Sequence, residues 1–379
     1  MLELWIIDVV NKKMKIKRAI ISGGGTGGHI FPAIAIADEI KRRNPDVEIL
    51  FVGAEGKMEM EKVPEAGYDI KGLQIVGFKR KLALSNFILP FKIIKSLLKA
   101  RKIVKEFKPQ VAIGVGGYAS GPTLKAATML RIPSMVQEQN SFPGKTNKIL
   151  SKSVQKICVA YDGLERFFPK EKIVLTGNPT RKNMVDISGK EKEGYEFYEF
   201  DANKKTILII GGSLGARTLN ESVLNKLEEL KNAGVNVLWQ CGKLYHEKLT
   251  EELKNTDLGS VKMVQFIHRM DLAYAVADVV ISRAGAISVS ELCLVKKPVI
   301  LVPSPNVSED HQTKNAMALV NKNAAIMVKD IEAKENLIPE ALRLLSDSSQ
   351  CSELTKNIAE LGKPNATQEI VDQLEALIK

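Results

Sequence analysis

Two glycine-rich turns, each at the end of a short apolar segment, are the parts of this sequence best suited to chemistry. The first is Gly23-Gly-Gly-Thr-Gly-Gly-His29, which follows residues 18–22 and precedes a helix-like segment at 30–39. The second is Gly211-Gly-Ser-Leu-Gly-Ala-Arg217, which follows residues 206–210. A strand, a glycine turn and a helix start bring backbone N–H groups and the positive end of a helix dipole to one point. Each turn therefore predicts a phosphate site, and two turns predict two nucleotide-type domains.

A third motif carries groups that suit a nucleotide. Residues 281–292 leave an apolar segment through the small-residue turn Ser282-Arg-Ala-Gly-Ala286 and then become helix-like. Backbone N–H groups there could hold phosphate, and Glu291 could accept both hydroxyls of a ribose. The alternative is structural, because Ser288 and Glu291 have the spacing of a helix-capping box. The residues alone do not separate these interpretations. Further on, Gln312 offers an amide to sugar hydroxyls.

Other nucleotide chemistries fit less well. The first turn also matches G-x-G-x-x-G, and Glu55 stands where a ribose-binding acid of a dinucleotide fold would lie, but this match is weak. No Gly-Lys-Ser/Thr follows any of the glycine turns, which excludes a P-loop NTPase. No Asp-x-Asp pair is present, so a metal-bridged nucleotide diphosphate is not expected. A bound pyrophosphate would then need helix ends and basic side chains such as Arg181 and Arg217.

The elements that must position these turns alternate along the whole chain. Apolar, β-branched runs are typical of buried parallel strands with helices on both faces. They occur at 47–53, 110–118, 132–137, 156–160, 235–239, 261–264, 279–282 and 298–302. We therefore predict an α/β protein with two doubly wound parallel-sheet domains. The polar stretch 181–205 is predicted to be the linker between them.

Composition narrows the class further. A length of 379 residues suits two such domains. The four cysteines are far apart and predict reduced thiols, not a disulfide framework or a zinc site. No uncharged apolar run approaches the roughly 20 residues needed to span a bilayer. Residues 1–13 lack the features of a signal peptide and are interpreted as an extension.

Basic residues concentrate in one region. Between Lys71 and Lys108 there are eleven basic residues and one acid, Glu106, out of a net charge of +11 for the chain. Apolar residues flank Lys79-Arg-Lys81, and an apolar stripe with helical spacing follows at 93–107. For that helix, packing on a sheet with solvated lysines is the favoured interpretation. For the region as a whole we predict contact with an anionic membrane surface, and no nucleic-acid partner. The residues expected at the membrane are Leu73, Ile75, Phe78, Lys79, Arg80, Lys81, Phe87, Ile88 and Phe91.

In their order along the chain, these motifs resemble those of the MurG family of bacterial glycosyltransferases. The resemblance extends from about Arg18 to the C-terminus and rests on the first glycine turn with Phe31-Pro32, Glu138-Gln-Asn140, Gly177-Asn-Pro179 with Arg181, the second glycine turn, Ser282–Ala286 and Asp310–Ala316. It implies a GT-B fold, in which two Rossmann-like domains face a central cleft. The implied domains are 14–181, which binds acceptor and membrane and is completed by a C-terminal helix at 366–379, and 182–365, which binds the UDP-sugar.

The resemblance also implies a function. It implies inverting transfer of GlcNAc from UDP-GlcNAc to the 4-hydroxyl of the MurNAc-pentapeptide of lipid I, which forms the β-1,4 bond of lipid II in peptidoglycan synthesis. The enzyme would need no metal or other cofactor and would act as a peripheral protein on the cytoplasmic face of the inner membrane. Other cell-wall synthesis proteins are candidate partners. The main alternative is another UDP-sugar transferase of the GT-B class that acts on a membrane lipid such as diacylglycerol. A nicotinamide dehydrogenase would leave the second glycine turn without a use.

Site residues carry over from the resemblance position by position. Those implied for UDP-GlcNAc are Thr26, Gly27, Gly28, Asn140, Arg181, Ser213, Ile267, Ala286, Ile287, Ser288, Val289, Ser290, Glu291 and Gln312. Within this set, Arg181 and Ser213 would meet the diphosphate, and Ile267 would pack on the uracil. Those implied for the acceptor pyrophosphate are Gly24, Gly25, Gly116, Gly117 and Tyr118.

The transfer needs a base for the attacking hydroxyl. Our hypothesis is His29, because the positive end of the helix that it begins disfavours imidazolium and keeps an acceptor nitrogen available. The alternative is that His29 only orients the glycine turn or donates to a phosphate. Glu138 is the second candidate for the base.

Overall fold

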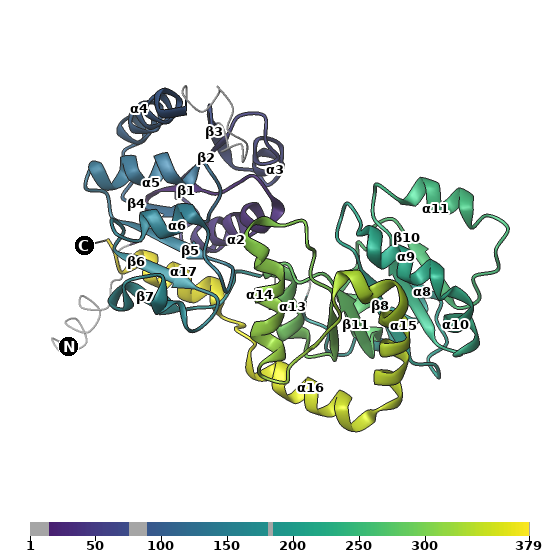
Figure 1. Ribbon diagram of the computed structural model, residues 1–379. Coiled ribbons are helices and arrows are strands. Elements are labelled where there is room, and N and C mark those ends of the chain that lie inside the picture. Colours follow the sequence, from purple (N-terminus) through teal and green to yellow (C-terminus); the bar gives the residue numbers. More distant parts are fainter. Residues whose placement is uncertain (1–14, 76–88, 181–184, 379) are drawn as a thin grey trace. The chain divides into compact units, whose positions relative to one another are not determined.

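The chain divides into two units, and each is built on its own sheet of parallel strands (Figure 1). The computed structural model describes residues 15–75, 89–180 and 185–378. The first unit comprises Met1–Thr180 with Asn365–Lys379, and the second comprises Arg181–Pro364. Several predicted site residues lie outside the described residues, namely Arg181, Phe78, Lys79, Arg80, Lys81, Phe87, Ile88 and the side chain of Phe91.

In the described part of the first unit, seven parallel strands have the order β3-β2-β1-β4-β5-β6-β7. They are β1 (Arg18–Ser22), β2 (Glu48–Ala54), β3 (Asp69–Leu73), β4 (Val111–Gly114), β5 (Ser134–Glu138), β6 (Lys156–Val159) and β7 (Ile173–Leu175). The helices are α2 (Gly27–Arg43), α3 (Glu59–Glu65), α4 (Leu89–Phe107), α5 (Ser120–Met129), α6 (Lys145–Leu150) and α17 (Ala366–Glu375). Alternate residues of β1 enter opposite layers of the core, since Ile21 packs with α2 and α17 and Ile20 packs with α4 and α5.

The C-terminal helix α17 is held to the first unit by one arginine as well as by apolar packing. Ile370, Val371 and Leu374 are buried in the same core cluster as α2. Arg43, the last residue of α2, donates to Asp372 at 2.8 Å and to Glu375 at 2.9 Å. The chain therefore returns to the first unit after completing the second.

In the described part of the second unit, six parallel strands have the order β10-β9-β8-β11-β12-β13. They are β8 (Thr206–Ile210), β9 (Asn236–Gln240), β10 (Val261–Val264), β11 (Val279–Ser282), β12 (Val299–Leu301) and β13 (Ile326–Met327). The helices are α8 (Glu191–Tyr198), α9 (Arg217–Asn225), α10 (Leu227–Asn232), α11 (His246–Glu252), α12 (Met270–Val276), α13 (Ala286–Val295), α14 (His311–Val320), α15 (Asp330–Ser346) and α16 (Ser348–Glu360). The predicted α/β class is confirmed for both units.

The prediction that 181–205 is a linker is wrong for its second half. Residues 191–198 form α8, which packs on α12 within the second unit. Tyr198 is buried there and donates its hydroxyl to the carbonyl of Arg269 at 3.0 Å. The helix escaped prediction because it is short and most of its surface is polar.

A partly buried ion cluster fastens this helix. Asp271 accepts from Lys190 at 3.0 Å and from Arg269 at 2.9 Å. The hydrogen bonds from Arg269 and then from Lys190 hold the pKa of Asp271 well below its usual range, although burial opposes this effect. A carboxylate with a lowered pKa stabilises the fold fully above the pKa of the unfolded chain, and that contribution decreases as the pH falls from there and is lost below the pKa of the folded chain.

We therefore expect Asp271→Asn to lower the free energy of unfolding of the second unit by about 1–3 kcal/mol at pH 7. The difference from the unaltered protein should shrink as the pH falls through about 4, near the pKa of an unfolded aspartate. Trp239, which is buried in the second unit, reports this unfolding by fluorescence in a Trp5→Phe background. Glu196→Gln, which removes an exposed ion pair on the same helix, is the control and should change stability by less than about 0.5 kcal/mol. A difference that does not depend on pH would contradict this assignment.

The basic region around α4 differs in part from the prediction. Leu73 was expected at the membrane, but it is the last residue of β3 and is 0% exposed, because it packs against α4 and α5 in the core. Ile75 is also partly buried against that core. The apolar stripe of α4 is buried at Ala100 and Val104, whereas Ile93, predicted on the same stripe, is exposed. The described helices include none with the length and apolar character needed to cross a bilayer.

Candidate functional site

Both sheets have a point at which the strand order reverses beside the first strand. In the first unit this point lies between β1 and β4, and in the second it lies between β8 and β11. In open parallel sheets, ligands bind outside the carboxyl ends of the strands at such a point. The first glycine turn follows β1 and the turn 115–119 follows β4, while the second glycine turn follows β8 and the turn 283–285 follows β11. Each pair of turns therefore lies at the expected position.

The two turns of the first unit are in close contact. A Cβ atom on Gly117 would lie 2.3 Å from the carbonyl oxygen of Gly24, and one on Gly116 would lie 2.6 Å from Cδ2 of His29. Both glycines have positive φ, at 84° and 98° respectively. Only glycine fits at these positions, since a side chain would force the turns apart. The structure thus brings together the residues predicted for the acceptor pyrophosphate and the candidate base.

The geometry of His29 defines which ring nitrogen carries a proton. Helix α2 begins at Gly27, so His29 lies in its first turn, as predicted. Nδ1 of His29 lies 3.0 Å from the carbonyl oxygen of Gly24. A carbonyl oxygen can only accept, so Nδ1 is the donor and Nε2 is the acceptor nitrogen of the neutral ring. A general base needs this tautomer, because its unprotonated Nε2 can accept the proton of the attacking hydroxyl.

The amide of Gly25 is already used within the first unit. Gly25 was predicted at the acceptor pyrophosphate, but its N–H donates to Oε2 of Glu59 at 2.8 Å. The amide therefore points into the first unit toward a carboxylate, which would repel a phosphate. Gly27 and Gly28 remain suited to an anion, because the first N–H groups of α2 have no partner within the helix.

The second candidate for the base, Glu138, does not have the geometry of one. It is 2% exposed at the end of β5. One carboxylate oxygen accepts from the backbone and side-chain amides of Asn140, at 3.0 and 3.2 Å. The other accepts from Gly144 N–H at 3.1 Å and from Asn147 Nδ2 at 2.8 Å. Glu138 thus fixes the loop that carries Asn140, and its proton-accepting positions are occupied.

Buried amides beside Glu138 extend this support, and the sequence analysis assigned them no role. Gln137 donates to Oδ1 of Asn178 at 2.9 Å, and Asn178 donates to the carbonyl of Gln139 at 3.0 Å. Gln139 in turn donates to the carbonyl of Val115 at 2.9 Å, in the turn after β4. Side chains from two segments and a backbone carbonyl from a third therefore support the loop carrying Asn140. The only sequence signal for Gln139 and Asn178 is that they lie within the motifs Glu138-Gln-Asn140 and Gly177-Asn-Pro179.

In the second unit, the glycine turn after β8 is locked to the next strand. Gln240 donates to the carbonyl of Gly212 at 2.8 Å, and Lys243 N–H donates to the carbonyl of Ser213 at 3.0 Å. A Cβ atom on Gly215 would lie 2.2 Å from the carbonyl oxygen of Cys241. Ser213 itself is exposed on this fixed turn, where a ligand could reach it.

The motif after β11 excludes one of the two interpretations of Ser288 and Glu291. Helix α13 begins at Ala286 with Gly285 as its N-cap, so Ser288 lies inside the first turn and the capping-box interpretation is wrong. The amides of Ala286, Ile287 and Ser288 occupy the first three positions of the helix, where no intrahelical acceptor exists. These amides suit a phosphate, and Glu291 lies in the next turn.

Two other residues predicted in this region are directed away from a ligand. The side chain of Val289 is buried, and Ser290 donates its hydroxyl to the carbonyl of Ala286 at 3.1 Å, within the helix. Arg283, the basic residue of the same motif, pairs with Asp330 and donates to the carbonyl of Val302 at 3.0 Å. It therefore fastens the turn to α15.

The residues predicted for uracil and sugar are only partly accessible. Ile267 is 3% exposed, so its side chain belongs to the core and only its backbone could meet a uracil, whereas Phe266 beside it is 46% exposed. Gln312 uses its amide oxygen to accept from Ser304 N–H at 2.8 Å. Its NH₂ group is the part suited to a sugar hydroxyl.

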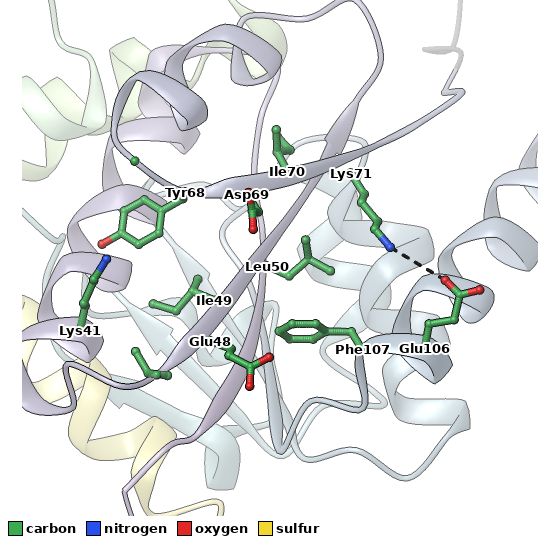
Figure 2. A pocket seen from close by; sticks show the side chains of 12 residues that line it. Lys41, Glu48, Ile49, Leu50, Tyr68, Asp69, Ile70, Lys71, Glu106 and Phe107 are labelled. Atoms are coloured by element: carbon green, nitrogen blue, oxygen red, sulfur yellow. Dashed lines mark ion pairs between the residues drawn. The ribbon is translucent and has the colours of Figure 1, made fainter.

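A cavity of about 660 Å³ in the first unit lies elsewhere (Figure 2). It is lined by the starts of β2 and β3 and by the end of α4, and two of its lining residues, Lys71 and Glu106, form an ion pair at 3.8 Å. The turns of the first unit follow the ends of β1 and β4, at the opposite edge of the same parallel sheet, so this cavity is not part of the candidate site. Within the described residues, no cluster of three or more His, Cys, Asp or Glu side chains could hold a metal ion.

Comparison with known proteins gives matches over nearly the whole chain. The glycosyltransferase family 28 N-terminal domain matches residues 19–159, and the glycosyltransferase family 28 C-terminal domain matches residues 206–373. A UDP-N-acetylglucosamine–N-acetylmuramyl-(pentapeptide) pyrophosphoryl-undecaprenol N-acetylglucosamine transferase of Flavobacterium psychrophilum is 54% identical over 97% of this chain and 99% of its own. The protein of the same name from Cytophaga hutchinsonii is 55% identical, and the match covers 97% of this chain and 98% of the relative.

A solved structure agrees with these sequence matches. The crystal structure of MurG from Acinetobacter baumannii superimposes with a TM-score of 0.77 at 30% identity, and the match covers 95% of this chain and 99% of that one.

Proposed function

This chain belongs to glycosyltransferase family 28, and on that basis we propose that it transfers N-acetylglucosamine from UDP-N-acetylglucosamine to lipid I, the pyrophosphoryl-undecaprenol-linked N-acetylmuramyl-pentapeptide. The observation that carries this proposal is the 54% identity to a transferase of that name over 97% of this chain and 99% of the relative. The site agrees, because two units each present a phosphate-type turn at the carboxyl ends of parallel strands.

The donor is assigned to the second unit. The first amides of α13 and the exposed Ser213 would hold the diphosphate of UDP, and Glu291 would accept the ribose hydroxyls. The NH₂ group of Gln312 would donate to the sugar. Helix N-termini and backbone amides would stabilise the charge that develops on the departing UDP, so we propose that transfer requires no metal.

The acceptor is assigned to the first unit. Its pyrophosphate would rest on the turn of Gly116 to Tyr118, close to His29, and on the amides of Gly27 and Gly28, which the resemblance implied for UDP-GlcNAc. Nε2 of His29 would take the proton from the 4-hydroxyl as that oxygen attacks the anomeric carbon, while UDP leaves from the opposite face. This displacement inverts the anomeric centre and gives a β-1,4 bond.

We propose that α4 contacts the cytoplasmic face of the membrane, because the polyprenyl tail of the acceptor lies in that membrane. Ile93, Ile94 and Leu98 are exposed on α4, and Leu98 is 60% exposed. Arg101 and Lys102 are exposed further along the same helix. Exposed apolar residues beside basic ones suit the anionic headgroup layer, and so we propose peripheral binding through this helix in place of the buried Leu73.

The proposal is tested by a transfer assay that crosses donors with acceptors. UDP-GlcNAc, UDP-glucose, UDP-galactose and UDP-GalNAc are each offered with a short-chain lipid I analogue or with diacylglycerol, in the presence of EDTA. We expect transfer from UDP-GlcNAc to the lipid I analogue alone, at a rate that the chelator does not change. Transfer to diacylglycerol with no product from lipid I would overturn the acceptor assignment, and loss of activity in EDTA would overturn the metal-free diphosphate site.

A further inference from the structure

Glu59 is a buried carboxylate that the proposed mechanism does not yet use. It lies at the start of α3 and is 0% exposed. One oxygen accepts from Gly25 N–H at 2.8 Å, and the other accepts from Ala54 N–H at the end of β2, at 3.0 Å. Within the described residues, no lysine, arginine or histidine forms an ion pair with it. Burial of a carboxyl group is costly unless it is hydrogen-bonded, and both of these hydrogen bonds come from backbone N–H groups.

The surrounding backbone is shaped to admit this side chain. A Cβ atom on Gly24 would lie 2.2 Å from Oε1 of Glu59, and a Cβ atom on Gly53 would lie 2.6 Å from its Cγ. The N-terminus of α2 begins just after Gly25 and supplies positive potential to the carboxylate. A glycine of the first glycine turn, a glycine of β2 and the two hydrogen bonds thus fix the carboxylate in one position.

The hydrogen bond from Gly25 reaches His29 through a single peptide group. The N–H of Gly25 and the carbonyl of Gly24 belong to the same planar peptide, and they point in opposite directions. The N–H donates to Glu59, and the carbonyl oxygen lies 3.0 Å from Nδ1 of His29. The order is therefore carboxylate, peptide, imidazole, and hydrogen bonds in such a chain polarise one another.

Thr26 lies near the same nitrogen, but the carbonyl of Gly24 is the nearer partner. Its hydroxyl oxygen lies 3.4 Å from the same Nδ1, which is farther than the carbonyl of Gly24. If Nδ1 carried no proton, its lone pair would face the carbonyl oxygen at 3.0 Å, which is unfavourable. The peptide orientation that Glu59 imposes thus selects the proton position on His29.

We propose that Glu59 is a positioning residue for transfer: through the Gly24–Gly25 peptide it holds His29 in the tautomer with the proton on Nδ1 and with Nε2 as the acceptor. This inference rests on the proposed function only for the role of His29 as the base. The tautomer itself is a property of the folded chain and can be measured without any substrate.

The first experiment measures the tautomer of His29 by ¹⁵N NMR of the imidazole nitrogens, at a pH where the ring is neutral. The chain has four histidines, and the signals missing from a His29→Ala sample identify those of His29. We expect Nδ1–H in the unaltered protein and a mixture of tautomers in Glu59→Gln, whose amide can accept only one of the two N–H groups. Glu55→Gln is the control, because it removes an exposed carboxylate paired with Lys99 at 2.6 Å in the segment after β2. It should leave the tautomer unchanged.

Kinetics supply a second measurement. We expect Glu59→Gln to lower kcat by roughly 10- to 100-fold, because a misplaced base costs rate, with KM for UDP-GlcNAc changed less than about threefold. In a His29→Ala background the same substitution should cost less than about twofold, because residues that act as one unit are not additive.

The outcomes separate the two proposals. An Nε2–H tautomer in the unaltered protein, or Nδ1–H retained in Glu59→Gln, would overturn the role of Glu59 whatever the substrate. Equal costs of Glu59→Gln in the presence and absence of His29 would do the same. If the tautomer behaves as expected but lipid I receives no sugar, the role of Glu59 stands and the proposed function fails.

Discussion

Replacement of His29 by alanine is expected to lower kcat for transfer to a lipid I analogue by about 10²- to 10⁴-fold, the usual cost of a lost general base. The structure supports this size of effect, because Nδ1 is occupied by the carbonyl of Gly24 and the neutral ring presents Nε2 as its acceptor. The measurement is steady-state transfer together with binding of UDP-GlcNAc by calorimetry, since removal of a base should change kcat without weakening the donor complex.

A second histidine gives a matched control for this substitution. His246 begins α11 in the second unit and is none of the residues assigned to the donor or the acceptor. His246→Ala should therefore retain kcat within about twofold, as is usual for substitutions away from a site. If His29→Ala loses less than about fivefold while substrate binding is unchanged, His29 only orients the glycine turn and the base must be sought elsewhere.

The central strands and the ligand-binding turns could be predicted from sequence because their causes are local. A run such as 206–210 is buried on both faces, and its β-branched residues show this without knowledge of its neighbours. The glycine turns and the helices after them follow from backbone geometry within a few residues. Of the four edge strands, β10 was predicted at 261–264, whereas β3, β7 and β13 were missed because they are short or carry no continuous apolar run. In β3, the segment Asp69-Ile-Lys-Gly-Leu73 is only partly buried and carries no continuous apolar run.

The direction of individual groups in the site could not be predicted, because it depends on contacts between distant segments. Nothing near Gly25 in the sequence shows that its N–H faces Glu59, which lies 34 residues later. Glu138 looked like a base because its type and motif were known, whereas its saturation by four donors appears only in the folded loop. Leu73 looked like a membrane residue because its neighbours are basic, but the strand that it ends turns it inward.

Gly117 provides the other large expected effect, because its backbone cannot accept a side chain. Its φ is +84°, which costs an L-residue about 1–2 kcal/mol, and a Cβ atom there would lie 2.3 Å from the carbonyl oxygen of Gly24. The overlap is with backbone and not with a flexible side chain, so the two turns must separate. We expect Gly117→Ala to lower kcat by at least about 10²-fold, the cost of displacing a reacting group by roughly 1 Å.

The matched control is four residues further along the chain. Gly121 lies inside α5, and a Cβ atom there would make ordinary contact with Thr146 at 3.6 Å. Gly121→Ala should retain kcat and raise the free energy of unfolding by about 0.5–1 kcal/mol, since alanine is the better helix former. Transfer kinetics and calorimetric unfolding of both variants separate the two effects. If Gly117→Ala keeps the kcat of the unaltered protein, contact between the two turns is not needed for transfer. The carbonyl of Gly24 would then still accept from Nδ1 of His29 after the neighbouring turn has moved. The orientation of the ring would therefore depend on Glu59 and not on the packing of Gly117.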